Sequence, residues 1–147
     1  MSSFQIIVGS MLGGTEYVAE ACEETLLALN HQVTLHLSPK FEEINSKNQT
    51  WLICTSTHGA GDFPDNIQSF IEDLKKSTVD LSTVKFMIIG IGDSNYDTFC
   101  KAAKDIQTLL LTRCCNEIIT LKTLDMREEI DPEDLAQQWL TSNSDLL

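Results

Sequence analysis

The chain has 147 residues, of which 42% are hydrophobic, and its 22 acidic and ten basic residues give a net charge of −12. This length allows one compact domain with its own core but not two, so we expect a single domain over residues 1–147. The negative charge repels phosphate backbones and anionic membranes, which argues against nucleic acid as a partner and favours encounter with basic protein surfaces.

Apolar runs rich in β-branched residues predict five short strands, at residues 5–8, 32–37, 51–55, 86–91 and 117–121. Between them, apolar residues at steps of three and four predict helices over residues 18–29, 67–74 and 99–110. Asp131 followed by Pro132 predicts the N-cap and first position of a last helix, which continues through Leu140. The connection between residues 37 and 50 is too short and broken for a full helix, so we expect only a turn around residues 41–44.

Strands that alternate with helices predict an α/β fold, with a doubly wound parallel sheet covered by helices on both faces. The common order for five strands is 2-1-3-4-5, and the ligand then binds beyond the carboxyl ends of the strands, near the switch between strands one and three. In this order strands one, three and four are neighbours. The loops that follow them should therefore meet over one crevice.

Those loops are rich in glycine, hydroxyl and amide groups: SMLGGT at residues 10–15, STHGAGD at residues 56–62 and GDSNYD at residues 92–97. One such loop alone would be a plain turn. Since three of them converge on the switch point, a binding site is the better interpretation.

The first loop leads from a strand directly into a helix and suits a phosphate group. The free N–H groups of the helix start can hold the phosphate together with the hydroxyls of Ser10 and Thr15. The loop contains no lysine or arginine, and it has neither the GK[ST] of nucleoside triphosphatases nor the GxGxxG of dinucleotide sites. A phosphomonoester fits best, although a glycine-rich helix start without a ligand stays open as an alternative.

The second and third loops supply flat side chains. His58, Tyr96 and Phe99, with Phe63 and Trp51 nearby, could enclose a planar aromatic ligand. Taken singly, His58 is typical of a loop histidine and Phe99 of a core residue. Tyr96 is the aromatic side chain that we expect to be exposed for contact.

The segments GSMLGGT, STHGAGDFPDN and GIGDSNYDTFC resemble, in order and spacing, the three FMN loops of flavodoxins and of the flavodoxin-like domains of diflavin reductases. The resemblance covers nearly the whole chain, and the last strand lacks the long insertion of long-chain flavodoxins. It implies a flavodoxin-like fold of the short-chain type that binds FMN. Within the family, the chain resembles a small bacterial FMN-binding protein.

Carried over by position, the resemblance implies three groups of FMN contacts, with no catalytic residue and no metal ligand. Tyr96 would stack on one face of the ring, the second loop would lie along the other side, and Asp125 is a weaker candidate beside the ring or ribityl chain. The implied contacts are Ser10, Met11, Leu12, Gly13, Gly14 and Thr15 at the phosphate, Ser56, Thr57, His58, Gly59, Ala60 and Gly61 in the second loop, and Gly92, Asp93, Tyr96, Phe99 and Cys100 in the third.

Two departures from the family pattern keep an alternative open. Leu12 stands where many relatives place a threonine that bonds the phosphate, and His58 stands where diflavin domains place an aromatic ring. Weak or lost FMN binding would leave a flavodoxin-shaped interaction protein, and a quinone-reducing flavoenzyme is a further alternative. A phospho-receiver domain is excluded, because it needs carboxylates at the ends of strands one and three, where this chain has Gly9-Ser10 and Thr55-Ser56.

The resemblance implies a one-electron carrier without a substrate of its own. Electrons would come from a separate reductase and pass to an acceptor enzyme, with biotin synthesis suggested by bacterial relatives. We expect a cytoplasmic monomer with basic-surfaced redox partners and no membrane contact, since no stretch approaches the roughly 20 apolar residues of a membrane span and the N-terminus lacks a basic lead. The acidic residues could equally serve solubility alone. The five cysteines lack metal spacing, so we expect reduced, mostly buried thiols.

Overall fold

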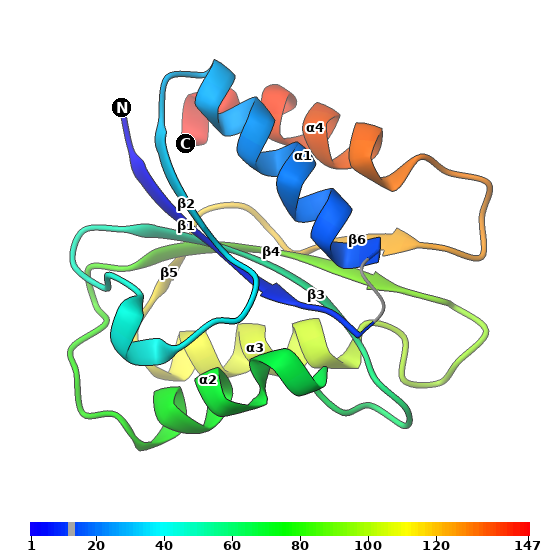
Figure 1. The fold of residues 1–147 in the computed structure, drawn as a ribbon, viewed down its shortest axis with the longest axis horizontal. Coiled ribbons are helices and arrows are strands. Elements are labelled where there is room, and N and C mark those ends of the chain that lie inside the picture. Colours follow the sequence, from blue (N-terminus) through cyan, green and yellow to red (C-terminus); the bar gives the residue numbers. More distant parts are fainter. Residues whose placement is uncertain (12–13) are drawn as a thin grey trace.

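The computed structural model describes residues 1–11 and 14–147, which form a parallel sheet with helices on both faces (Figure 1). Its strands are β1 (Ser3–Gly9), β2 (Gln32–His36), β3 (Thr50–Ser56), β4 (Lys85–Gly92), β5 (Asn116–Glu117) and β6 (Lys122–Asp125). Its helices are α1 (Gly14–Ala28), α2 (Asp65–Lys76), α3 (Lys101–Thr112) and α4 (Pro132–Ser142), with 3-10 turns η1 (Phe41–Glu43) and η2 (Ser144–Leu146).

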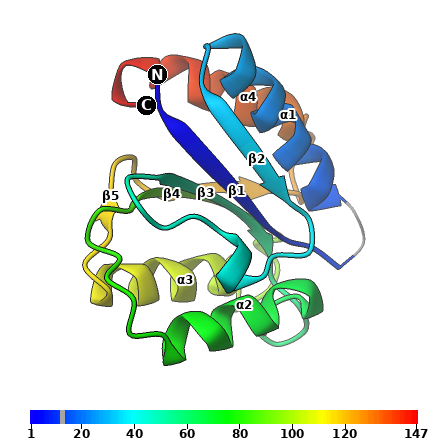
Figure 2. The same ribbon diagram turned by 60° about the vertical axis from the view of Figure 1, so that its left-hand side comes forward.

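The strand order is β2-β1-β3-β4-β5, with β6 also paired to β4, and every pairing of these strands is parallel. Helices α1 and α4 cover one face of the sheet, and α2 and α3 cover the other (Figures 1 and 2). The doubly wound fold and the order 2-1-3-4-5 are therefore confirmed. None of the described helices is long and apolar enough to cross a bilayer.

The predicted fifth strand, at residues 117–121, is wrong in its bounds. The chain forms two short strands, and between the pairs Phe86–Glu117 and Ile89–Lys122 it advances five residues while β4 advances three. Ile118 and Ile119 both pack into the core on the α1 and α4 side. Adjacent residues of a regular strand point to opposite faces, so the strand must break where two neighbours enter the same core.

One core lies on each side of the sheet, because successive strand residues alternate between its faces. Phe4, Ile6 and Val8 of β1 pack under α1 and α4, whereas Ile7 packs under α2 and α3. Burial on both faces explains why these strands read as continuous apolar runs.

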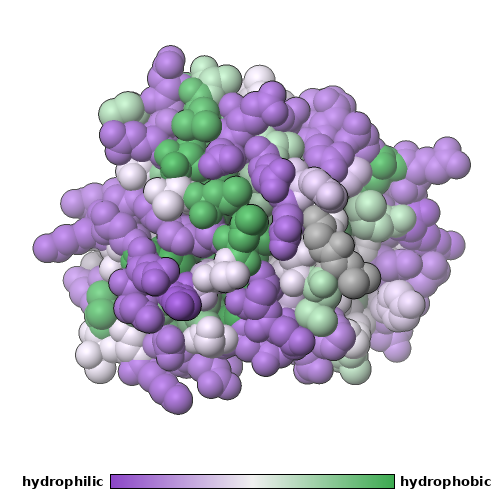
Figure 3. All heavy atoms as spheres, viewed as in Figure 1, coloured by the Kyte–Doolittle hydropathy of each residue, from purple (hydrophilic) through white to green (hydrophobic). Residues whose placement is uncertain are grey.

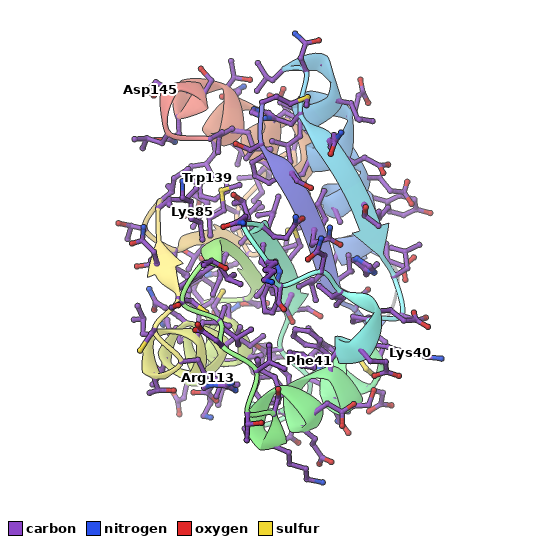
Figure 4. All side chains as sticks on the ribbon, turned by 90° about the vertical axis from the view of Figure 1, so that its left-hand side faces the viewer. Lys40, Phe41, Lys85, Arg113, Trp139 and Asp145 are labelled. Carbon is purple, nitrogen blue, oxygen red and sulfur yellow. The ribbon has the colours of Figure 1, made fainter. Side chains whose placement is uncertain are left out.

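Trp51, which we predicted to lie near a ligand, belongs instead to the core at the start of β3. Its side chain is fully buried, its ring meets Phe70 edge-on at 5.9 Å, and its indole N–H donates to the carbonyl of Asn45 at 3.0 Å. Phe41 of η1 points toward α2 (Figure 4), and its ring centroid lies 6.1 Å from that of Phe70. The expected turn around residues 41–44 is thus present as η1, and its Phe41 packs against this core.

The last helix starts as predicted. Asp131 is its N-cap, with Oδ1 accepting the N–H of Asp134 at 3.1 Å, and Pro132 is the first helical residue. The third helix starts two residues later than predicted, at Lys101, since Cys100 has a φ of 53° and cannot continue a right-handed helix toward Phe99.

Strand β2 forms one edge of the sheet and carries no formally charged residue. A diagonal band of hydrophobic residues follows it across a mostly hydrophilic face (Figure 3). Val33 and Leu35 are partly buried against the core below, and Leu37, just beyond the strand, is 37% exposed.

Candidate cofactor site

Two cavities lie side by side along the carboxyl ends of β1, β3 and β4, and both are lined by Ser56, Thr57 and Ile91. The first, which we call the Ser10 cavity, has a volume of about 580 Å³, and the second, the Tyr96 cavity, about 440 Å³. The Ser10 cavity is also lined by Met11, Gly14, Thr15, Val18, His58, Met126, Pro132 and Glu133, and the Tyr96 cavity by Gly59, Gly92, Asp93, Tyr96, Thr98, Phe99 and Cys100. All three predicted loops therefore contribute residues to these two adjoining cavities.

Some of the predicted site residues lie elsewhere. Ala60 and Gly61 line neither cavity, and Gly61 instead borders a third hollow beside Lys101 and Phe63. Leu12 and Gly13 lie outside the described residues. The expectation that Leu12 weakens phosphate binding therefore stays a prediction.

The Ser10 cavity offers neutral hydrogen-bond groups and little positive charge. The hydroxyl-bearing residues Ser10 and Thr15 are 9% and 4% exposed, and a Cβ placed on Gly14 would have no atom within 4 Å. Among the described residues that line this cavity there is no lysine or arginine, and Glu133 adds a carboxylate. Any anion here must therefore be held by hydroxyls and by the N–H groups at the start of α1 rather than by opposite charge.

The second loop is held by hydrogen bonds at both of its ends. Thr57 Oγ1 accepts the N–H of Ala102 at 3.1 Å and so caps the first turn of α3. His58 and Asp62 exchange two backbone hydrogen bonds of 2.8 Å, which close a tight turn. Gly59, in this turn, has a φ of 54°, a left-handed conformation that glycine adopts without strain.

His58 and Tyr96 do not face one another across a single cavity. The imidazole of His58 is exposed and lines the Ser10 cavity, whereas Tyr96, which is 66% exposed, lines the Tyr96 cavity. The expected exposure of Tyr96 is confirmed. Of these two rings, only Tyr96 is therefore in place to stack on a ligand in the Tyr96 cavity, whereas the predicted sandwich needs both.

The third loop is shaped by turns around Asp93. Asp93 Oδ1 accepts the N–H of Asn95 at 2.8 Å, and the carbonyl of Asp93 accepts the N–H of Tyr96 at 3.1 Å. The carbonyl of Tyr96 in turn accepts the N–H of Phe99 at 3.2 Å. These turns carry Tyr96 to the mouth of the cavity and direct Phe99 and Cys100 toward its wall.

Asp125 supports this loop from the end of β6. Its Oδ1 accepts the N–H groups of Ser94 and Arg127, each at 3.1 Å. The hydrogen bonds from Ser94 lower the pKa of Asp125 below its ordinary value. Asp125 lines a separate hollow beside Phe99 and neither of the two main cavities, so the structure gives it a role in holding the loop.

Cys100 is the buried thiol of the site. Its residue is 1% exposed, and Sγ lies 3.3 Å and 3.2 Å from the places where Gly90 and Gly92 would carry a Cβ. Burial raises the pKa of Cys100 to about 11, so the thiol stays protonated at neutral pH. Glycine at both positions of β4 is what allows this close approach.

Asn66 is a residue that the sequence analysis missed. Its side chain, in the first turn of α2, accepts the N–H of Ser10 at 2.8 Å and donates to the carbonyls of Val8 and Leu37 at 2.8 and 3.0 Å. The only sequence signal was its place in the motif DFPDN, which predicts no contact with β1.

Comparisons with known proteins place these features in one family. The family model described as flavodoxin matches residues 6–139. The chain is 44% identical to "Protein MioC homolog" of Pasteurella multocida, covering 92% of this chain and 91% of that protein, and 40% identical to "Protein MioC" of Escherichia coli K12, covering 100% and 99%. The structure of a cysteine-to-alanine mutant of flavodoxin from Pseudomonas aeruginosa is 27% identical, covers 99% of this chain and 98% of its own, and superposes with a TM-score of 0.91. The chain therefore belongs to the flavodoxin family.

Proposed function

We propose that this protein binds FMN and carries single electrons between a separate reductase and an acceptor enzyme. The observation that carries the proposal is the pair of adjoining cavities at the ends of β1, β3 and β4, one bordered by the hydroxyl-bearing residues Ser10 and Thr15 and one by the exposed ring of Tyr96. Their volumes of about 580 and 440 Å³ are in the usual range for sites of small ligands and cofactors. Bound FMN would supply one-electron chemistry that no side chain of the site offers.

The Ser10 cavity fits the phosphate end of the cofactor. Ser10, Gly14 and Thr15 lie where β1 is followed by α1, so two hydroxyl-bearing residues and the start of a helix border the same cavity. Because the described lining residues include no lysine or arginine, the site favours a single phosphate that is hydrogen-bonded on several sides over a more highly charged di- or triphosphate.

The Tyr96 cavity fits the isoalloxazine ring. Tyr96 can stack on a flat heterocycle at the mouth, and Phe99 and Cys100 supply an apolar wall. Asp93 places a carboxylate in the lining, and Asp62 and Asp97 add carboxylates to the two loops that contribute residues to this cavity. Like-charge repulsion from these groups disfavours additional negative charge on the ring, which makes the reduced cofactor a stronger electron donor.

The partners follow from charge. A net charge of −12 steers the protein toward basic surfaces, so we expect a donor and an acceptor whose docking faces carry lysine and arginine. The resemblance to small bacterial members of the family suggests an enzyme of biotin synthesis as the acceptor. Electron transfer to a basic partner should slow steeply as salt screens this attraction.

The decisive experiment is flavin binding by the purified apoprotein. Addition of FMN should quench flavin fluorescence with saturation at one equivalent, and potentiometric titration of the complex should show two separate one-electron steps. Failure to bind FMN in excess would overturn the proposal and favour a flavodoxin-shaped interaction protein.

The two tyrosines of the chain offer a matched pair of variants. Tyr17 and Tyr96 are exposed to similar extents, 62% and 66%, but only Tyr96 lines a cavity. Tyr96→Ala should weaken FMN binding at least about fivefold, since an aromatic stack contributes about 1 kcal/mol beyond burial. Tyr17→Ala should leave it unchanged, and equal effects of the two variants would exclude the Tyr96 cavity as the ring site.

A further inference from the structure

The amide side chain of Asn66 occupies the place where β1 and β2 separate. The last paired residues of these strands are Ile7 and His36, so the next pair would be Val8 and Leu37. Asn66 Nδ2 donates to the carbonyls of both, at 2.8 and 3.0 Å. The side chain therefore bridges the two strands one step beyond their own ladder.

The same side chain also fixes the start of the first loop. Asn66 Oδ1 accepts the N–H of Ser10 at 2.8 Å, directly after β1 ends at Gly9. Both N–H donors of the amide and one acceptor position are thus used on three backbone groups. No other residue type of this size provides two donors and an acceptor in one plane.

The segment around Asn66 follows the second loop in the sequence and contacts the first loop in space. Asn66 lies in the first turn of α2, four residues after the second loop ends at Asp62, and the N–H of its neighbour Asp65 donates to Met11 Sδ at 3.3 Å. The start of α2 is therefore hydrogen-bonded to the first loop at both Ser10 and Met11.

We propose that Asn66 is a positioning residue for the phosphate end of the cofactor site. By holding the backbone of Ser10, it sets the direction in which the first loop leaves the sheet and hence where the donors at Ser10, Gly14 and Thr15 point. This inference rests on the proposed FMN function. It adds that affinity for the phosphate is set by an asparagine that lines neither of the two cavities.

The test compares FMN with riboflavin, which carries the same ring but no phosphate. In Asn66→Ala the dissociation constant of FMN should rise roughly tenfold or more, because hydrogen bonds of about 1 kcal/mol each no longer hold the loop. The dissociation constant of riboflavin should change less than about threefold, since its binding does not use the loop. Asn143→Ala is the matched control, because Asn143 donates to the carbonyl of Trp139 at 2.8 Å at the far end of α4 and should leave both constants unchanged.

A second readout needs no cofactor. In the apoprotein, the amide proton of Ser10 should exchange with solvent faster in Asn66→Ala than in the wild type, while amides in the middle of β3 keep their protection. Asn66→Ser retains one donor and one acceptor and should show intermediate effects, so it replaces the alanine variant if that variant does not fold.

The outcomes separate the two proposals. Equal weakening of FMN and riboflavin, or no weakening of either, overturns the positioning role of Asn66 while leaving the FMN function intact. Unchanged exchange of the Ser10 amide also overturns it. A wild-type protein that binds neither flavin overturns the proposed function, and the role of Asn66 falls with it.

Discussion

Substitution of Gly90 by alanine tests how closely α3 approaches the sheet behind the Tyr96 cavity. An ideal Cβ on Gly90 would lie 2.8 Å from the Cβ of Ala103 and 3.2 Å from that of Cys100. Carbon atoms in contact prefer roughly 3.5–4.0 Å, and Ala103 has no rotamer to change, so α3 must move away from β4 by roughly 1 Å. Such overpacking costs about 1–3 kcal/mol.

The assay is urea unfolding of the apoprotein. With a denaturant dependence of about 2 kcal/mol/M, a loss of about 2 kcal/mol lowers the midpoint of Gly90→Ala by roughly 1 M. Gly14→Ala is the control for unfolding, because a Cβ there has no neighbour within 4 Å. FMN binding should weaken in Gly90→Ala as well, since the movement carries Phe99 and Cys100 with the wall of the cavity.

A double-mutant cycle identifies the cause. Ala103→Gly alone should lose about 1 kcal/mol, the usual penalty for glycine inside a helix. Combined with Gly90→Ala, it removes the methyl group that clashes, so the double variant should be more stable than the sum predicts by about 1 kcal/mol or more. An unchanged midpoint for Gly90→Ala, or strict additivity in the cycle, would refute the close approach of α3.

Three further predictions concern the loops. Thr57→Val removes the acceptor that caps α3 and should lower the free energy of unfolding by about 1 kcal/mol, whereas an unchanged urea midpoint would contradict the cap. Iodoacetamide at pH 8 should modify the exposed Cys114 first and leave Cys100, with its pKa of about 11, unmodified until the chain unfolds, as mass spectrometry of peptides can show. Asp125→Ala should destabilise the protein at pH 7. Because hydrogen bonds from Ser94 lower the pKa of Asp125 from its ordinary value of 3.8, this difference is present above that value and should vanish in more acidic urea titrations, as pH falls through the lowered pKa.

Much of the fold could be predicted because local signals agree with it. The apolar runs of β1, β3 and β4 are buried on both faces, and the Asp131-Pro132 signal matches an actual cap. Three loops rich in small polar residues also predicted one crevice, since the order of parallel strands decides which loops are neighbours.

The remaining features depend on contacts that a linear pattern does not contain. The break between β5 and β6 arises because Ile118 and Ile119 enter the same core, which a hydrophobic run cannot reveal. Cys100 adopts a positive φ although it is not a glycine, so the start of α3 was predicted too early. The hydrogen bonds of Asn66 to β1 span more than 50 positions of sequence, and only the folded chain brings them together.

The net negative charge of the chain also protects the edge strand β2 from pairing with other copies of the protein. A strand paired on one side presents unsatisfied backbone groups to any similar strand, and β2 has no lysine, proline or inward charge of the kind that usually blocks such pairing. The net charge of −12 keeps copies of the molecule apart and so protects this edge at a distance. Concentrated salt or acid would remove that protection, and self-association should then begin along β2.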